Sequence, residues 1–301
     1  MISHILLCPK QICGDIMERI KFEKGLQIYY GILVLIVAFV CVSQLKLQNN
    51  YQTNQKIIHS QLEYDQFRKM EIHPKLIELI VNNPCKNYIG YLTYEMLTNR
   101  YSLLEKETMN QKDIFKQIRS VENSDTYEEL YYYYQMIFPD LKYFPIPSQK
   151  LGEEYVSYED SWGAQRTYGG KRLHEGTDLM ASNNKRGFFP IISVSDGIVE
   201  KKGWLSQGGW RIGVRAPSGA YFYYAHLYSY ADGLEEGDQV KAGQLLGFMG
   251  DSGYGDEGTI GQFDVHLHFG IYIDSKEGEM SVNPYYILKY LEDHRLTCDY
   301  S

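Results

Sequence analysis

The sequence has no long run of lysine and arginine, and its formal net charge at pH 7 is −8. A nucleic-acid-binding protein needs a concentration of positive charge, so this composition excludes nucleic acid as the expected partner. Cysteine is scarce, with five in 301 residues, whereas 44% of the residues are hydrophobic. That share is enough to fill a folded core, and the length leaves room for about two domains.

Charge is also absent from the 21 residues between Lys24 and Lys46. Within this stretch, Ile28 to Val42 is almost wholly apolar. At a rise of about 1.5 Å per residue, such a segment is long enough to cross the hydrocarbon core of a membrane. A buried core helix would usually be shorter or would carry a polar stripe, so we predict a transmembrane helix at residues 26–45.

The segment lacks the marks of a cleaved or lipidated leader. No Ala-x-Ala pattern follows Val42, and roughly 25 residues precede the apolar run, which favours a retained anchor over a signal peptide. Cys41 is a candidate for lipidation, but the two residues before it, Phe39 and Val40, are bulky where lipoprotein signals have small residues. We therefore expect a single-pass anchor.

The flanking charges predict its orientation. The N-terminal side carries more positive charge than the other side, with Lys10, Arg19, Lys21 and Lys24 against Lys46 and Lys56. By the positive-inside rule, residues 1–25 are expected in the cytoplasm and the C-terminal part outside the cell membrane. Cys85 and Cys298 would then be external, where a disulfide could form, although the sequence alone does not pair them.

Residues 46–147 have the apolar spacing of several helices. Pro74 opens one helix, and Ile114, Ile118 and Val121 mark another. Thr126-x-x-Glu129 suggests a capping box at the start of a tyrosine-rich helix. No catalytic constellation is visible here, so we interpret this region as a helical stalk or small helical domain whose protein partners are unknown.

Two prolines near residue 147 end the helical pattern, and glycine becomes frequent after them. Short alternating runs then predict strands at Ile192–Val199, Trp210–Ala216, Ala220–Leu227 and Phe263–Tyr272. Residues 148–301 should therefore form a mostly antiparallel β domain. The expected fold class is α+β, with an N-terminal transmembrane helix, an α-helical juxtamembrane region and this C-terminal domain.

Histidines mark the chemistry of the β domain. Polar and apolar residues alternate from Phe263 to Phe269, so Asp264, His266 and His268 should share one face of a strand. Two imidazoles on one face are costly to bury without a partner. A site is therefore favoured over a chance arrangement.

A second motif places His174 and Asp178 four residues apart, with Gly176 between them. In extended structure these residues share a face, and the glycine leaves room for an ion. Imidazole and carboxylate ligands suit zinc, whose catalytic sites use three protein ligands and a water. A further histidine, His226, ends a tyrosine-rich strand and could reach the same cleft.

Together these motifs resemble the lysostaphin-type (LytM) family of zinc endopeptidases, from about Ser157 to Leu288. The resemblance also includes Ser161-Trp162-Gly163, the Gly237–Gly243 turn, the Gly250–Gly261 loop and Asn283-Pro284. It implies that His174, Asp178 and His268 are the zinc ligands and that His226 and His266 are catalytic residues that stay off the metal. Tyr168, six residues before His174, is a weaker candidate to assist at the oxyanion.

The resemblance implies a substrate in peptidoglycan, either cross-bridges or stem peptides, and the predicted external location agrees with it. One alternative is a catalytically silent LytM-like scaffold or activator in a cell-envelope or sporulation assembly. Such proteins usually lose ligands, whereas all five positions here carry histidine or aspartate. Another alternative is a biotinyl or lipoyl carrier with Lys241 as the modified residue, but the neighbours of Lys241 do not fit that motif.

Overall fold

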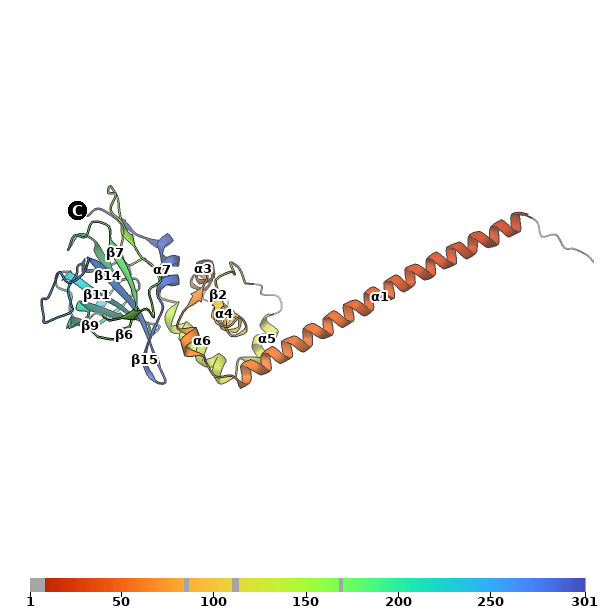
Figure 1. Ribbon diagram of the computed structural model, residues 1–301, viewed down its shortest axis with the longest axis horizontal. Coiled ribbons are helices and arrows are strands. Elements are labelled where there is room, and N and C mark those ends of the chain that lie inside the picture. Colours follow the sequence, from red (N-terminus) through yellow and green to blue (C-terminus); the bar gives the residue numbers. More distant parts are fainter. Residues whose placement is uncertain (1–8, 84–86, 110–113, 168–169, 301) are drawn as a thin grey trace, which may run out of the picture. The chain divides into compact units, whose positions relative to one another are not determined.

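The computed structural model describes residues 9–83, 87–109, 114–167 and 170–300. The chain divides into two compact units, Met1–Lys56 and Ile57–Ser301. The described part of the first unit belongs to one long helix, α1 (Pro9–His59). The described part of the second unit contains six shorter α-helices, α2 to α7, together with a β domain. Figure 1 shows these elements.

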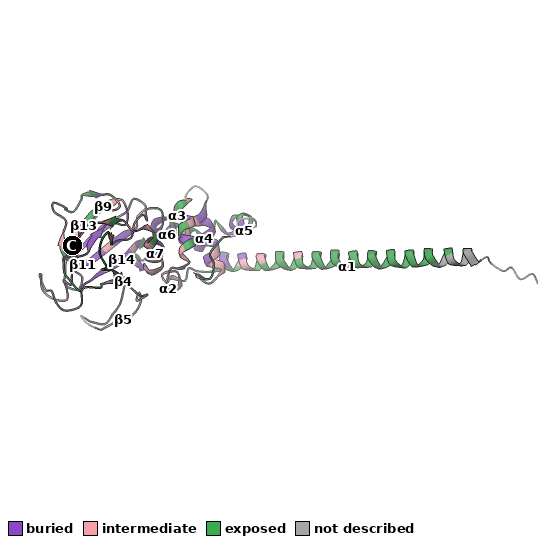
Figure 2. Cartoon of the chain, turned by 90° about the horizontal axis from the view of Figure 1, so that it is seen from above, coloured by how far each residue is buried: buried purple, intermediate pink, exposed green. Residues whose placement is uncertain are grey.

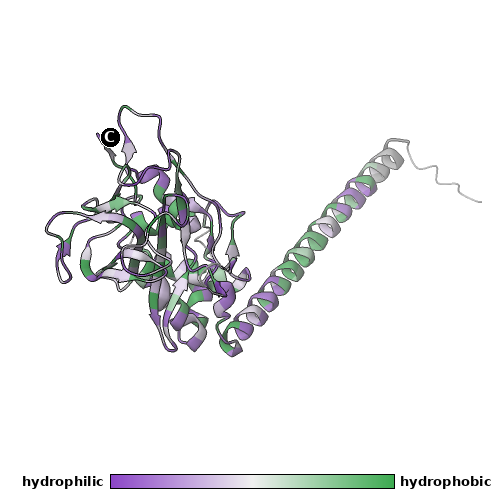
Figure 3. Cartoon of the chain, turned by 60° about the vertical axis from the view of Figure 1, so that its left-hand side comes forward, coloured by the Kyte–Doolittle hydropathy of each residue, from purple (hydrophilic) through white to green (hydrophobic). Residues whose placement is uncertain are grey.

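Helix α1 is exposed along nearly all of the part between Met17 and Gln48 (Figure 2). Its middle is hydrophobic around the whole circumference, and no part of this apolar window is buried (Figure 3). By length and composition the helix can cross a membrane, and the predicted segment 26–45 lies within it. These properties support the membrane anchor.

The helices of the second unit follow the predicted apolar spacing. Pro74 occupies the first turn of α3, and His73 caps that helix by accepting a hydrogen bond from the backbone nitrogen of Lys75. The helical region contains α2 (Tyr64–Phe67), α3 (Pro74–Asn82), α4 (Tyr88–Thr98), α5 (Ile114–Val121) and α6 (Asp125–Ile137). Two short parallel strands, β1 (Glu71–Ile72) and β2 (Ser102–Leu103), lie among them.

The predicted capping box of α6 is wrong. The helix begins at Asp125, its N-cap is Ser124, and no side chain caps it. Thr126 instead donates to the carbonyl oxygen of Ser60, and Glu129 accepts hydrogen bonds from two tyrosines. Tertiary contacts thus use both side chains that the local motif would have used.

The β domain is built on an antiparallel sheet. In the described part of the chain it has ten strands, with the path β12-β9-β10-β11-β14-β7-β4, while β13 joins β11 to β8 and β15 pairs with β14. The strands are β4 (Val156–Ser157), β7 (Thr177–Ala181), β8 (Pro190–Ile192), β9 (Gly197–Leu205), β10 (Gly209–Arg215), β11 (Tyr221–Tyr230), β12 (Gln239–Val240), β13 (Leu245–Met249), β14 (His266–Ser275) and β15 (Gly278–Val282). The predicted antiparallel β domain is confirmed.

Shorter elements complete the domain. Strands β5 (Gln165–Arg166) and β6 (Arg172–Leu173) form a separate hairpin, and β3 (Ser148–Gln149) pairs with β16 (Thr297–Cys298). Helix α7 (Tyr285–Leu291) packs against α3. Among the described residues Cys298 has no disulfide partner, and Cys85 lies outside them, so the possible pairing of the two stays a prediction.

The predicted strand Ile192–Val199 is two strands. Strand β8 ends at Ile192 and β9 begins at Gly197, because the backbone between them bonds to loops and side chains. The nitrogen of Val194 donates to the hydroxyl of Tyr224, and a carboxylate oxygen of Asp196 accepts from the nitrogen of Ala242. Val194, which lies in the turn between the two strands, is buried. Its burial explains why the sequence stays apolar there although the strand is interrupted.

Side chains on the central strands alternate between a core and an open face. Ile212, Phe222 and Phe269 are fully buried on the core face. The opposite face carries Tyr223 on β11 and His268 on β14, both of which line a cleft. The alternation predicted from the sequence therefore positions the site.

Helices and β domain share one continuous apolar core within the second unit. Arg68, just after α2, donates to the carbonyl oxygen of Ser281 at 2.8 Å and to its hydroxyl at 2.9 Å. Its guanidinium also lies 5.1 Å from the centre of the Trp162 ring. At the other side, the hydroxyl of Ser218 donates to the carbonyl oxygen of Met136 in α6.

Candidate metal site and cleft

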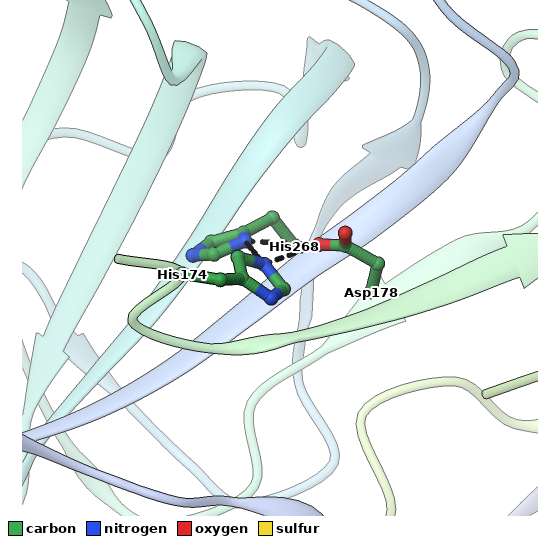
Figure 4. Close-up of side chains that lie close together, drawn as sticks. All are labelled: His174, Asp178 and His268. Carbon is green, nitrogen blue, oxygen red and sulfur yellow. Dashed lines mark hydrogen bonds and ion pairs between the residues drawn. The ribbon is translucent and has the colours of Figure 1, made fainter. Parts of the chain in front are cut away.

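Two imidazoles and one carboxylate from different segments meet in the β domain (Figure 4). Nε2 of His174, Nδ1 of His268 and Oδ1 of Asp178 lie 3.0 Å apart in each of the three pairs. His268 projects from β14 and Asp178 from β7, whereas His174 precedes β7. The structure therefore brings the three predicted ligands together.

The strand register explains two of these positions. His268 and Asp178 are directly opposite each other in the ladder of β14 and β7, where neighbouring side chains are in contact range. Gly176 permits the approach of the ring: an added Cβ there would lie 2.6 Å from Cε1 and Nε2 of His268 and from the carbonyl oxygen of Phe269. The space expected for an ion at Gly176 is thus used by the His268 ring.

The arrangement fits a metal ion. Ligand nitrogens 2.0–2.1 Å from a tetrahedral zinc would be about 3.3 Å apart, close to the separation observed. Two imidazoles and a carboxylate also match the three-ligand sets of catalytic zinc sites. His174, Asp178 and His268 could therefore hold such an ion.

Neighbouring groups orient the ligand atoms. Nδ1 of His174 lies 3.0 Å from the carbonyl oxygen of Ser161 and 3.1 Å from Nη2 of Arg166. The carbonyl oxygen can accept a proton from Nδ1, and that tautomer leaves the lone pair on Nε2. Arg166 donates to Oδ2 of Asp178 at 2.7 Å, so Oδ1 faces the two imidazoles. Ser161 and Arg166 therefore turn the ligand atoms toward one point.

His226 occupies a strained position in β11. Its φ is +63°, which is rare for a residue other than glycine, and the register with β10 shifts at this point. Such a bulge re-aims a side chain. Nδ1 of His226 donates to the carbonyl oxygen of Ser252 at 2.7 Å, so Nε2 carries the lone pair.

His266 lies beside His226, with ring centres 4.7 Å apart. Its Nδ1 donates to the carbonyl oxygen of Asp264 at 2.7 Å, which again leaves the lone pair on Nε2. Nε2 of His266 is 3.8 Å from Oδ1 of Asp178, so this histidine borders the group of three. Asp264 itself precedes β14 and bonds to Asn184, so the expected shared face begins only at His266.

Burial controls the charges in this cluster. It lowers the pKa of His226 well below the usual histidine value, and the neighbouring imidazoles add to the effect. Burial also lowers the pKa of His266 and of His268. At Asp178 burial opposes the charged form, but the close imidazoles of His174, His268 and His266 outweigh it and hold the pKa well below its usual value. Neutral imidazoles beside a carboxylate are the protonation states that bind metal.

The cluster lies in a cleft of about 690 Å³. One part of its wall carries Arg172, Tyr254 and Phe263, and the ring of Phe263 packs against His226 with centres 4.6 Å apart. Another part carries tyrosines and charged residues, namely Tyr221, Tyr223, Tyr272, Glu200, Lys201, Arg211 and Glu279. An extended peptide has room in such a cleft.

All five predicted site residues therefore lie in one place, although their roles remain predictions. Tyr168 lies outside the described residues. Among the described aromatic residues of the β domain, Tyr223 lines the cleft, whereas Trp162, Trp204 and Trp210 do not. Sequence reasoning missed Arg166 and Arg211, because only the folded chain brings these isolated residues to the cleft.

Comparison with known proteins gives consistent matches. Residues 172–284 match Peptidase family M23. A solved structure from Ruminococcus gnavus, provisionally named a glycyl-glycine endopeptidase LytM, is 43% identical and covers 83% of this chain and 99% of its own, with a TM-score of 0.70.

Curated relatives match over part of their length. An L-Ala–D-Glu endopeptidase from Bacillus subtilis is 45% identical over 142 residues, which are 47% of this chain and 41% of that protein. Lysostaphin from Staphylococcus simulans is 30% identical over 119 residues, which are 39% of this chain and 22% of that protein. The chain thus spans less than half the length of either curated relative.

Proposed function

Because this chain belongs to peptidase family M23, we propose that it is a zinc-dependent endopeptidase that hydrolyses peptide bonds in bacterial peptidoglycan. The observation that carries the proposal is the group of three ligand atoms 3.0 Å apart, with two further imidazoles beside it. A scaffold would not require these five side chains in one cleft.

In this proposal, His174, Asp178 and His268 hold the zinc. The ion, when bound, supplies a Lewis acid that activates water and polarises the carbonyl group of the substrate. Arg166 keeps Oδ2 of Asp178 occupied, so that Oδ1 is directed to the metal. The carbonyl oxygen of Ser161 holds the tautomer of His174 that exposes Nε2.

His226 and His266 act without binding the metal. Both donate from Nδ1 to a backbone carbonyl oxygen, so both present Nε2 as an acceptor. Either can take the proton of the attacking water, and the imidazolium formed can then donate a proton to the leaving amine. The other histidine can orient the water, because its Nε2 also accepts a hydrogen bond.

Two curated relatives are named for the peptide bonds that they cut, an L-Ala–D-Glu endopeptidase and the glycyl-glycine endopeptidase ALE-1 from Staphylococcus capitis. Their names support a peptide substrate of this kind. In our proposal α1 crosses the cell membrane once, with residues 1–25 in the cytoplasm. The cleft would then face the compartment in which peptidoglycan lies.

The test is to incubate the full chain in detergent with purified peptidoglycan and to identify released fragments by mass spectrometry. New amine ends that disappear with a zinc chelator and return on adding zinc would support the proposal and would name the bond. His266→Ala serves as the matched inactive control. No release by folded, zinc-loaded chain would favour the scaffold interpretation instead.

A further inference from the structure

Arg211 has a buried nitrogen without a partner. Its Nη1 is inaccessible to solvent and has no hydrogen-bond partner among the described residues. The residue lies on β10 and lines the cleft. Its neighbour Ile212 is fully buried in the core, so alternation along the strand turns Arg211 to the open face.

The surroundings of Arg211 supply aromatic rings and no counter-ion. Tyr221 and Tyr223, on the neighbouring strand β11, line the same cleft, and the charge of Arg211 opposes the rise that burial causes in the pKa of both phenols. Among the described residues, Arg211 forms no ion pair with a carboxylate. Glu200, which also lines the cleft, accepts two hydrogen bonds from Arg215, at 2.6 and 3.0 Å.

A buried guanidinium nitrogen without a partner is unfavourable, because it has lost water without gaining an acceptor. The Arg211 side chain as a whole is only half-buried, so a ligand in the cleft can reach the guanidinium. A folded protein can tolerate this free-energy cost at a binding site, where a ligand supplies the missing hydrogen-bond acceptor. The planar guanidinium fits a carboxylate in particular, because it can donate two parallel hydrogen bonds. The position of Arg211 in the cleft means that a bound peptide can bring this carboxylate.

We propose that Arg211 binds a free carboxylate of the substrate, so that the enzyme selects carboxylate-bearing stem peptides over uncharged glycyl bridges. The inference rests on the proposed function and goes further, since it assigns a specificity-determining residue. A peptide cut next to glutamate retains one carboxylate, whereas a glycine-only bridge offers none along its length.

The experiment compares two peptides with the full chain in detergent: one with an alanyl-glutamate bond and its free carboxylate, the other with that carboxylate as an amide. The wild type should favour the acid. Arg211→Gln should lower kcat/KM for the acid about 10- to 100-fold, mainly through KM, and leave the amide almost unchanged. Arg211→Lys should restore part of the difference.

Two controls separate this inference from other effects. Lys201→Gln removes the same charge from the cleft wall and should retain the preference for the acid. The melting temperature of Arg211→Gln should not fall, because no contact of Nη1 is lost. Equilibrium binding of the two peptides gives a readout that is independent of turnover.

The two proposals fail in different ways. Equal loss on both peptides, or an acid preference that survives Arg211→Gln, overturns the role of Arg211 and leaves the peptidase intact. No cleavage of either peptide or of peptidoglycan by zinc-loaded chain overturns the proposed function. If neither substrate is cleaved, equal binding affinity for the acid peptide and the amide peptide overturns the carboxylate site as well.

Discussion

At the scale of single residues, His226 shows how backbone strain serves the site. A left-handed backbone costs a non-glycine residue roughly 1–2 kcal/mol. His226 adopts this conformation at the bulge in β11, and the centre of its ring lies 4.7 Å from the centre of the His266 ring. The strain is thus stored where a side chain must leave the regular alternation of its strand.

The assigned roles predict two classes of variant. His268→Ala and Asp178→Asn should lose both bound zinc and activity, because the first removes a ligand nitrogen and the second removes the negative charge of the ligand carboxylate. His226→Ala and His266→Ala should keep the zinc but lower kcat about 100-fold or more. Metal content by mass spectrometry, measured beside turnover, checks the split. Zinc loss in His226→Ala would contradict the assignment.

Gly176→Ala should damage the site by overpacking. The new Cβ would lie 2.6 Å from the His268 ring and from the carbonyl oxygen of Phe269, so the ring must move. We expect about 1–3 kcal/mol of lost stability together with weaker zinc binding. Gly31→Ala is the control, because nothing lies within 4 Å of its added Cβ. Thermal unfolding and zinc titration measure both effects, and unchanged zinc affinity would show that the close approach is unimportant.

At the scale of elements, strands β9 and β10 carry a pair of charged residues with a pH signature. Hydrogen bonds from Arg215 hold the pKa of Glu200 below its usual value of 4.5, although burial works against this. A carboxyl group with a lowered folded-state pKa stabilises the fold above its unfolded pKa. That stability is lost as the pH falls through the folded-state value.

Replacing Glu200 with Gln should therefore flatten the acid side of the stability profile. The melting temperature of the wild type should fall more than that of Glu200→Gln between about pH 6 and about pH 3. The effect will be modest, because this pair is partly exposed. Glu257→Gln, at an exposed loop position, is the control and should follow the wild type. Parallel curves for wild type and Glu200→Gln would contradict the linkage.

At the scale of the whole molecule, residues 57–147 share a core with the β domain, and the contacts of Arg68 lie at this boundary. A chain shortened to residues 57–301 should therefore fold and unfold in one transition. A chain of residues 148–301 would expose part of the core and should aggregate or melt at a clearly lower temperature. Calorimetry and size-exclusion chromatography check this. Equal stability of both would instead support an independent domain at the predicted boundary of 147 and 148.

Local patterns in the sequence determined much of this protein. The uncharged run of α1, the spacing of α3 and α5 and the alternation of β14 follow from side chains that repeat at the period of their element. The histidine motifs placed His266 with His268 and His174 with Asp178, and their resemblance to a known family implied His174, Asp178 and His268 as the ligand group, which the structure brings together.

Only the tertiary structure decided the rest. The bulge at His226, the contact of Arg166 with Asp178 and the unpartnered nitrogen of Arg211 depend on residues from separate strands. Thr126 bonds to Ser60 rather than capping its helix for the same reason. Local propensities amount to a few tenths of a kcal/mol up to about 1 kcal/mol, so contacts between distant segments override them wherever burial or a buried hydrogen bond is at stake.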